Sequence, residues 1–169
     1  MQGYGASVRG LGERRGLRET AREHALLPLR IFLGVTFVYA GLDKLTEPSF
    51  FRATGPGSIG ETMHAVRDSA AIPALVDLAL KSPGFFGYAI AIGELLVGLG
   101  TFFGLWGRIA ALGGALISLS LWLTVSWAVS PYYFGNDLAY LMAWLPLVLG
   151  GAGAFSLDAF LARRRRRIR

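Results

Sequence analysis

Residues 85–106 read FFGYAIAIGELLVGLGTFFGLW, a run of 22 residues that holds a single charged side chain, Glu94, near its centre. At about 1.5 Å per residue, a helix of this length reaches roughly 33 Å, which is enough to cross the hydrocarbon of a bilayer. A carboxylate at the midpoint of such a span is costly to place in lipid. The sequence therefore predicts a transmembrane helix in which Glu94 has a partner or a functional role.

The composition of the whole chain agrees with a membrane protein. Of its 169 residues, 53% are hydrophobic and only 17% are charged, and the mean hydropathy is +0.48. The chain has the length of one domain, so we expect no separate soluble domain. Its 23 glycines are typical of helices that pack closely within a membrane.

Four apolar segments predict four membrane-spanning helices, at about 26–45, 85–106, 109–129 and 137–157. These segments are apolar on all sides instead of alternating, which favours helices over membrane β-strands. We therefore expect an all-α fold, an integral membrane four-helix bundle that occupies residues 25–158.

Arginines cluster outside these spans, in an arm at 1–24, in a tail at 159–169 and at Arg108 in a short link. Positive charge marks the cytoplasmic side, and an even number of spans places both termini on one side. We expect a multi-pass protein of the cytoplasmic (plasma) membrane with both termini cytoplasmic and the arm disordered. The lipid bilayer is the expected partner of the basic clusters, and nucleic acid is not.

The long connection at 46–84 contains signals for two short amphipathic helices. Ser58 and Glu61 form a capping-box pattern, and Pro73 can occupy the first turn of a second helix. Both helices are too short and too charged to cross a bilayer, so we expect them at the outer membrane surface, over the bundle. A lid and a passive cover fit this pattern equally well.

The charged residues near the spans should pair within the bundle, because charges at equal depth avoid lipid. Three pairs are expected: Arg30 with Glu94, Lys44 with Asp137, and Arg108 with Asp158. We interpret the Arg108–Asp158 pair as structural and favour a functional role for Glu94. Pro146 should bend the last span beside Trp144, which favours a pocket there.

The chain offers few groups that could carry a redox centre. It has no cysteine, and His24 and His64 lie outside the long apolar runs. We therefore expect no iron–sulfur cluster, no haem and no metal site.

Three blocks resemble the DoxX family, which includes the DoxD small subunit of thiosulfate:quinone oxidoreductase. They are LRIFLGVTFVYAGLDKL (29–45), GELLVGLGTFFGLWGRIAAL (93–112) and PYYFGNDLAYLMAWLPLVLGGAGAFSLD (131–158). The resemblance implies a membrane subunit of a quinone-linked oxidoreductase that oxidises thiosulfate or another reduced sulfur compound. It also implies a second oxidoreductase subunit or a soluble redox enzyme as partner, and it leaves a homo-oligomer open.

A quinone bound as substrate needs hydrogen-bond donors for its two carbonyls, apolar walls for its ring, and two protons on reduction. With the resemblance in mind, we assign Glu94 and Arg30 as catalytic candidates. The candidates for quinone binding are Tyr39, Asp43, Lys44, Asn136, Asp137 and Trp144.

Two other classes of function remain open. A non-catalytic anchor or assembly subunit for a soluble redox or stress enzyme would have a solid core, with Glu94 neutralised and no cavity. A small transporter would need a polar path, for which the spans offer few polar side chains.

Overall fold

The structure is a computed structural model that describes residues 24–167, and within this range it contains helices and no strand. The expected all-α class is therefore confirmed for the described part. The helices are α2 (Leu27–Thr46), α3 (Ile59–Val66), α4 (Pro73–Leu80), α5 (Pro83–Phe103), α6 (Gly107–Thr124), α7 (Asn136–Gly150) and α8 (Leu157–Arg167), with a 3₁₀ turn at Tyr132–Phe134. Nearly all of the arm at 1–24 lies outside the described residues.

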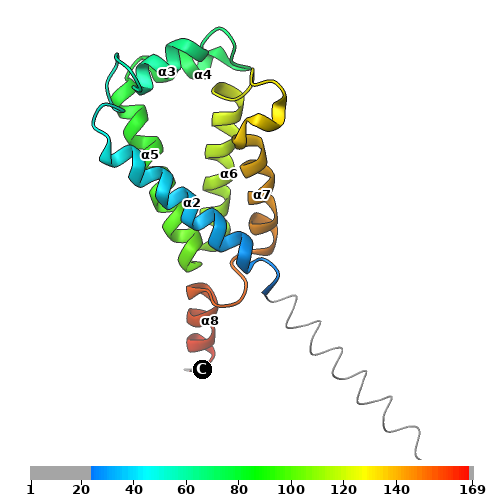
Figure 1. Ribbon diagram of the computed structural model, residues 1–169. Helices are drawn as coiled ribbons and strands as arrows, with labels where there is room; N and C mark the ends of the chain where they lie inside the picture. The colour runs from blue at the N-terminus through cyan, green and yellow to red at the C-terminus, as the bar shows by residue number, and fades with distance from the viewer. Residues whose placement is uncertain (1–23, 168–169) are drawn as a thin grey trace, which may run out of the picture.

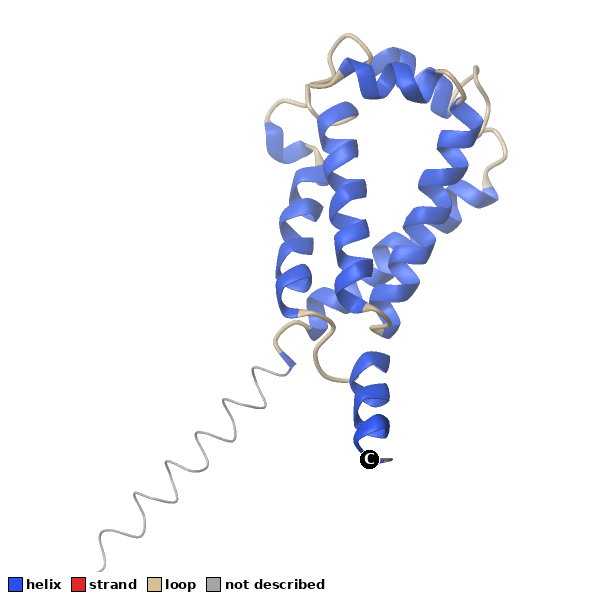
Figure 2. Ribbon diagram, turned by 180° about the vertical axis from the view of Figure 1, so that it is seen from behind, coloured by secondary structure: helices blue, strands red, loops and turns tan. Residues whose placement is uncertain are grey.

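Four long helices form the body of the molecule. Helix α2 packs along α5, α6 packs along α7, and α5 also contacts α6, so the two pairs are joined (Figure 1). The short helices α3 and α4 lie across one end of the body, and α8 extends from the opposite end (Figure 2). We call α3 and α4 together the cap.

Glycines set the distance and the register between α2 and α5. A Cβ added to Gly34 would lie 2.9 Å from the backbone of Phe102, and one added to Gly98 would lie 2.5 Å from the backbone nitrogen of Val38. Nearer the cap, a Cβ on Gly41 would lie 2.7 Å from a carbonyl oxygen of α5. The two helices are therefore antiparallel and touch backbone to backbone, as small residues allow.

The apolar core between the helix pairs is built around Trp144. Its side chain is completely buried, and a Cβ on Gly114 would overlap the indole ring. The Phe37 ring meets the indole edge-on, with ring centroids 4.9 Å apart. Trp144, which we had assigned to quinone binding, is thus a core residue, because the notch at Gly114 accepts its indole.

The cap follows the pattern expected from the sequence. The hydroxyl of Ser58 accepts a hydrogen bond from the Glu61 amide at 3.2 Å at the start of α3, and Pro73 stands in the first turn of α4. Arg67 and Asp77 form an ion pair that joins the two helices, and the hydrogen bond from Arg67 holds the pKa of Asp77 below its usual range. The predicted pair of loop helices is confirmed.

The last predicted span, at 137–157, is wrong in its extent. Helix α7 ends at Gly150, because Gly151 has φ +75° and ψ −165°, a backbone conformation that side-chain-bearing residues rarely adopt. Helix α8 then begins at Leu157 and includes most of what we expected to be a separate tail. Helix α6 also ends early, at Thr124.

Two of the described helices, α5 and α6, are long and apolar enough to cross a membrane by length and composition. Helix α2 has 20 residues but carries Arg30, Asp43 and Lys44, and α7 has 15 residues. The expectation of four membrane spans therefore stays a prediction.

The α2–α5 contact predicts different effects for two glycines of α5. Gly98→Ala should lower the free energy of unfolding by about 1–3 kcal/mol, because the new methyl group meets backbone that cannot move aside. Gly93→Ala is the matched control, since its Cβ would lie 3.4 Å from Ile117, an ordinary contact. Unfolding in detergent, followed by circular dichroism, measures both. Equal stability of the two variants would contradict this packing.

Candidate functional site

The site is built around a buried ion pair between α2 and α5. Glu94, at the middle of α5, is 4% exposed, and its Oε2 accepts a hydrogen bond from Lys44 Nζ at 2.8 Å. Lys44 stands in the last turn of α2 and also donates to the carbonyl of Ala40 at 3.3 Å. A carboxylate at this depth is stabilised by an opposite charge that is itself hydrogen-bonded.

The predicted pairing of Glu94 with Arg30 is wrong, and the register of the two helices explains why. Gly34 faces Phe102, which lies eight residues from Glu94, or roughly 12 Å along the helix axis. Arg30 lies a further turn away from Glu94 than Gly34 does. Its side chain is therefore at the wrong end of α5 to reach the carboxylate.

Arg30 instead holds the segment between α7 and α8. Its side chain is buried, and it donates from Nη1 to the carbonyls of Ala152 and Ala154 and from Nη2 to that of Phe155, the latter two at 2.9 Å. A planar guanidinium with several donors suits this task, because a segment outside a helix leaves its carbonyls without regular partners. Arg30 is thus a structural residue of the end of the molecule opposite to the cap.

The predicted Arg108–Asp158 ion pair is also wrong, as no salt bridge joins the two residues in the described part of the chain. Asp158 accepts hydrogen bonds from the amides of Trp106 and Gly107, both at 2.9 Å, at the start of α6. Amides at a helix N-terminus lack partners within the helix and attract a carboxylate. Arg108 donates to the carbonyl of Leu149 at 3.2 Å.

A second carboxylate lies near the buried pair. Asp137, in the first turn of α7, accepts a hydrogen bond from the Ser126 hydroxyl, and it lies within electrostatic range of both Lys44 and Glu94. The predicted proximity of Lys44 and Asp137 is therefore present, although the ion pair of Lys44 is with Glu94. One cation faces two carboxylates, so the group can take up one more proton than a simple ion pair.

These groups line a pocket of about 540 Å³ between α2 and α7, which we call the ion-pair pocket. Its volume lies within the range typical of small-molecule sites. Six of the predicted site residues line it: Tyr39, Asp43, Lys44, Glu94, Asn136 and Asp137. Arg30 and Trp144 do not. The structure thus brings together most of the residues that we assigned to quinone binding.

The sequence interpretation missed further lining residues, among them Ser126 and Tyr140. Tyr140 follows Asn136 by one helical turn, so helical spacing from Asn136 identifies it. Ser126 follows the end of α6, and no sequence pattern points to it. The hydroxyls of Tyr39 and Tyr140 and the amide of Asn136 are polar groups that can orient a ligand. Among the described residues, no group of three or more His, Asp or Glu side chains could hold a metal ion.

A family model for DoxX matches residues 25–127, more than half of the sequence. The chain belongs to the DoxX family. DoxX proteins are membrane-associated, in agreement with the two apolar helices α5 and α6. The matched region includes Lys44 and Glu94 but ends before α7, so Asn136 and Asp137 lie outside it. No curated protein and no solved structure matched the chain.

In this DoxX protein, the role of Arg30 can be tested by stability. Arg30→Met should lower the free energy of unfolding by about 2–4 kcal/mol, because three carbonyls lose a charged donor. Arg108→Met is the matched control and should cost less than about 1 kcal/mol, since Arg108 is exposed and makes a single such bond. Chemical unfolding in detergent measures both values. A loss of similar size in the two variants would show that the buried guanidinium does not secure the segment.

The Lys44–Glu94 pair can be tested with a double-mutant cycle. Lys44→Met should cost about 3 kcal/mol of stability, because it leaves a buried carboxylate without its cation. Adding Glu94→Met should recover much of that loss, since two apolar side chains then replace the pair. The measurement is the same unfolding experiment on the two single variants and the double variant. Losses that simply add would mean that the two side chains are not coupled.

Proposed function

We propose that this DoxX protein is the membrane subunit of a quinone-linked oxidoreductase and that the quinone head binds in the ion-pair pocket. The observation that carries the proposal is the buried Lys44–Glu94 pair, with Asp137 close by, on the wall of a pocket of about 540 Å³. Intramembrane ionisable groups beside a cavity are typical of proton-coupled sites. Two aromatic side chains that also line the pocket, Phe37 and Phe134, suit a flat ring.

The proposal includes a four-helix membrane bundle, for which the surface of the helices gives support. In the most apolar stretches of α5 and α6, only 28% and 33% of the residues are buried within the protein. Large apolar side chains such as Leu96, Phe103 and Leu116 face outward. Outward apolar faces suit lipid contact. In this bundle α2 and α7 also cross, with the short α7 matched by local thinning of the bilayer.

The orientation follows from the charges. Helix α2 begins, and α8 extends, at the end of the bundle opposite the cap (Figure 1). The arginine-rich arm directly precedes α2 in the sequence, α8 itself is rich in arginine, and positive charge favours the cytoplasmic side. We infer that both termini are cytoplasmic in the plasma membrane and that the cap faces the outer surface. The ion-pair pocket then lies in the outer half of the bundle, because Lys44 and Asp137 stand at the helix ends nearer the cap.

Quinone takes up two electrons and two protons to form quinol. Lys44 and the polar groups of Tyr39 and Asn136 hydrogen-bond the quinone oxygens, and Glu94 and Asp137 pass protons to them. The two electrons come from a reduced sulfur compound such as thiosulfate, and they reach the quinone through contact with a second oxidoreductase subunit. When two thiosulfate ions lose one electron each, they join to form tetrathionate.

The competing proposal is a non-catalytic anchor for a soluble enzyme. In that case the ion pair would serve only to fix α2 against α5, and the core beside it would be solid. The ion-pair pocket favours the quinone site over the anchor, because it leaves a ligand-sized space next to the buried charges.

Glu94→Gln tests the proposed proton transfer. The protein is purified with its native partners, and quinol formation from decylubiquinone is measured with thiosulfate as donor. The variant should be at least about tenfold slower, since general acid catalysis contributes about 100-fold or more. Asp68→Asn is the matched control, because Asp68 is exposed, does not line the pocket and is paired with its neighbour Arg67.

Two results would contradict the proposal. Equal rates for the natural chain and Glu94→Gln would remove Glu94 from the mechanism. A natural chain that fails to bind any quinone would overturn the assignment of the pocket and leave the anchor as the better explanation.

A further inference from the structure

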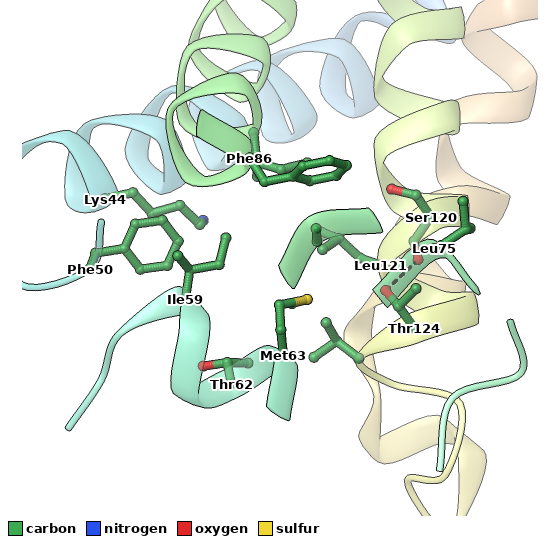
Figure 3. A pocket seen from close by; sticks show the side chains of 13 residues that line it. Lys44, Phe50, Ile59, Thr62, Met63, Leu75, Phe86, Ser120, Leu121 and Thr124 are labelled. Carbon is green, nitrogen blue, oxygen red and sulfur yellow. Dashed lines mark hydrogen bonds between the residues drawn. The ribbon is translucent and has the colours of Figure 1, made fainter. Parts of the chain in front are cut away.

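A second cavity lies under the cap. It has a volume of about 240 Å³ and is lined by α3 and α4 on the side of the cap and by α5 and α6 on the side of the body (Figure 3). We call it the cap chamber. Its lining residues are Lys44, Phe50, Ile59, Thr62, Met63, Leu75, Ala79, Phe86, Ile90, Ser120, Leu121, Thr124 and Val125.

The cap chamber offers almost no hydrogen-bond donor to a ligand. Each of its three hydroxyls already donates to a backbone carbonyl three or four residues earlier in the chain. The hydroxyls are those of Thr62, Ser120 and Thr124, and the distances are 3.0, 2.8 and 2.7 Å. Lys44 is the single charged residue in the wall. The remaining surface consists of aliphatic and aromatic side chains and of Met63. Such a surface favours a hydrocarbon ligand over a polar one.

The size of the chamber is sufficient for part of a hydrocarbon chain. An apolar cavity of about 150 Å³ in another protein stays free of water and binds benzene. The cap chamber is larger, and its lining is comparable in character. A cavity of this kind gains contacts when an apolar group fills it.

The cap chamber adjoins the ion-pair pocket. Lys44 and Leu121 line both spaces, so they form a common wall between α2 and α6. In Figure 3 the Lys44 side chain extends toward the apolar residues beneath the cap. A ligand with a polar head and an apolar tail could place its head beside the ion pair and its tail past this wall. The order of the two spaces, polar and then apolar, matches such a molecule.

We propose that the cap chamber binds the hydrocarbon tail of the quinone whose head occupies the ion-pair pocket. The inference rests on the proposed function, because it assigns the two parts of one substrate to two adjoining spaces. It also gives the cap a role, which is to form the roof over the tail. The chamber thereby causes the protein to bind a quinone with a tail in preference to the same ring without a tail.

The chamber can be filled by a substitution within α4. Ala79→Leu adds an isobutyl group in place of a methyl at a buried position in the chamber wall. Ala74→Leu makes the same change on the exposed side of the same helix and is the matched control. Leu75→Trp, at a partly exposed wall position, is a second filling variant in case Ala79→Leu does not fold.

Binding is measured for the full-length protein in lipid nanodiscs, with two ligands that share one head. One is decylubiquinone, and the other is the same ring without a tail. The concentration of each ligand is expressed as its mole fraction in the lipid. The natural chain and Ala74→Leu should bind the tailed quinone at least tenfold more tightly than the tailless ring. Ala79→Leu should lose most of that preference and keep its affinity for the tailless ring. A photoreactive group at the end of the tail should label peptides that contain Ile59–Met63 and Leu75–Ala79.

The outcomes separate this inference from the proposed function. If both quinones bind but the tail adds nothing, or if Ala79→Leu weakens both ligands equally, the tail site is overturned while the quinone site stands. If neither quinone binds, both proposals fail. A photoreactive fatty acid distinguishes the remaining case. Labelling of the same peptides by the fatty acid, without quinone binding, would assign the chamber to membrane lipid and would overturn the assignment to a quinone tail.

Discussion

The backbone contact between α2 and α5 is the constraint on which the rest of the structure depends. Glycines at three levels allow the two helices to touch, and at each level an added methyl group would meet backbone atoms. Because helices in direct backbone contact cannot slide past each other, the register is fixed. That register places Lys44 opposite Glu94 and carries Arg30 to the far end of the helix pair. The glycine positions therefore determine which of the buried charges lie opposite each other.

The sequence was informative where the signal is local. The capping pattern of Ser58 and Glu61 predicted α3, Pro73 predicted the start of α4, and the apolar run at 85–106 predicted α5. Capping and hydrophobic runs can be read from the sequence because they involve residues that are close together in the chain. The polar residues at the ends of α2 and α7 line one pocket in the structure, and their role in binding stays a prediction. Their positions followed from the alternating direction of successive spans.

The partner of Glu94 could not be read from the sequence, because the offset between α2 and α5 depends on contacts across a connection of many residues. Arg30 and Lys44 stand about four helical turns apart on α2, and spacing along the chain does not define which of them lies opposite Glu94. The break at Gly151 was hidden for another reason. Gly150–Gly151–Ala152–Gly153 reads equally well as close helix packing and as the end of a helix, and only the backbone conformation distinguishes them.

Arg30 has a consequence for the order in which the molecule is completed. It belongs to the first described long helix, yet its hydrogen-bond partners are carbonyls of residues 152–155, which the ribosome adds more than a hundred residues later. Until those residues are synthesised, the guanidinium has to be hydrated or bound by other polar groups, because a charged group buried without partners is costly. The first helix therefore reaches its final environment only after the last part of the bundle has been synthesised. A chain that stopped before Ala152 would lack these carbonyls, so its Arg30 could not reach the buried, hydrogen-bonded position that it has in the structure.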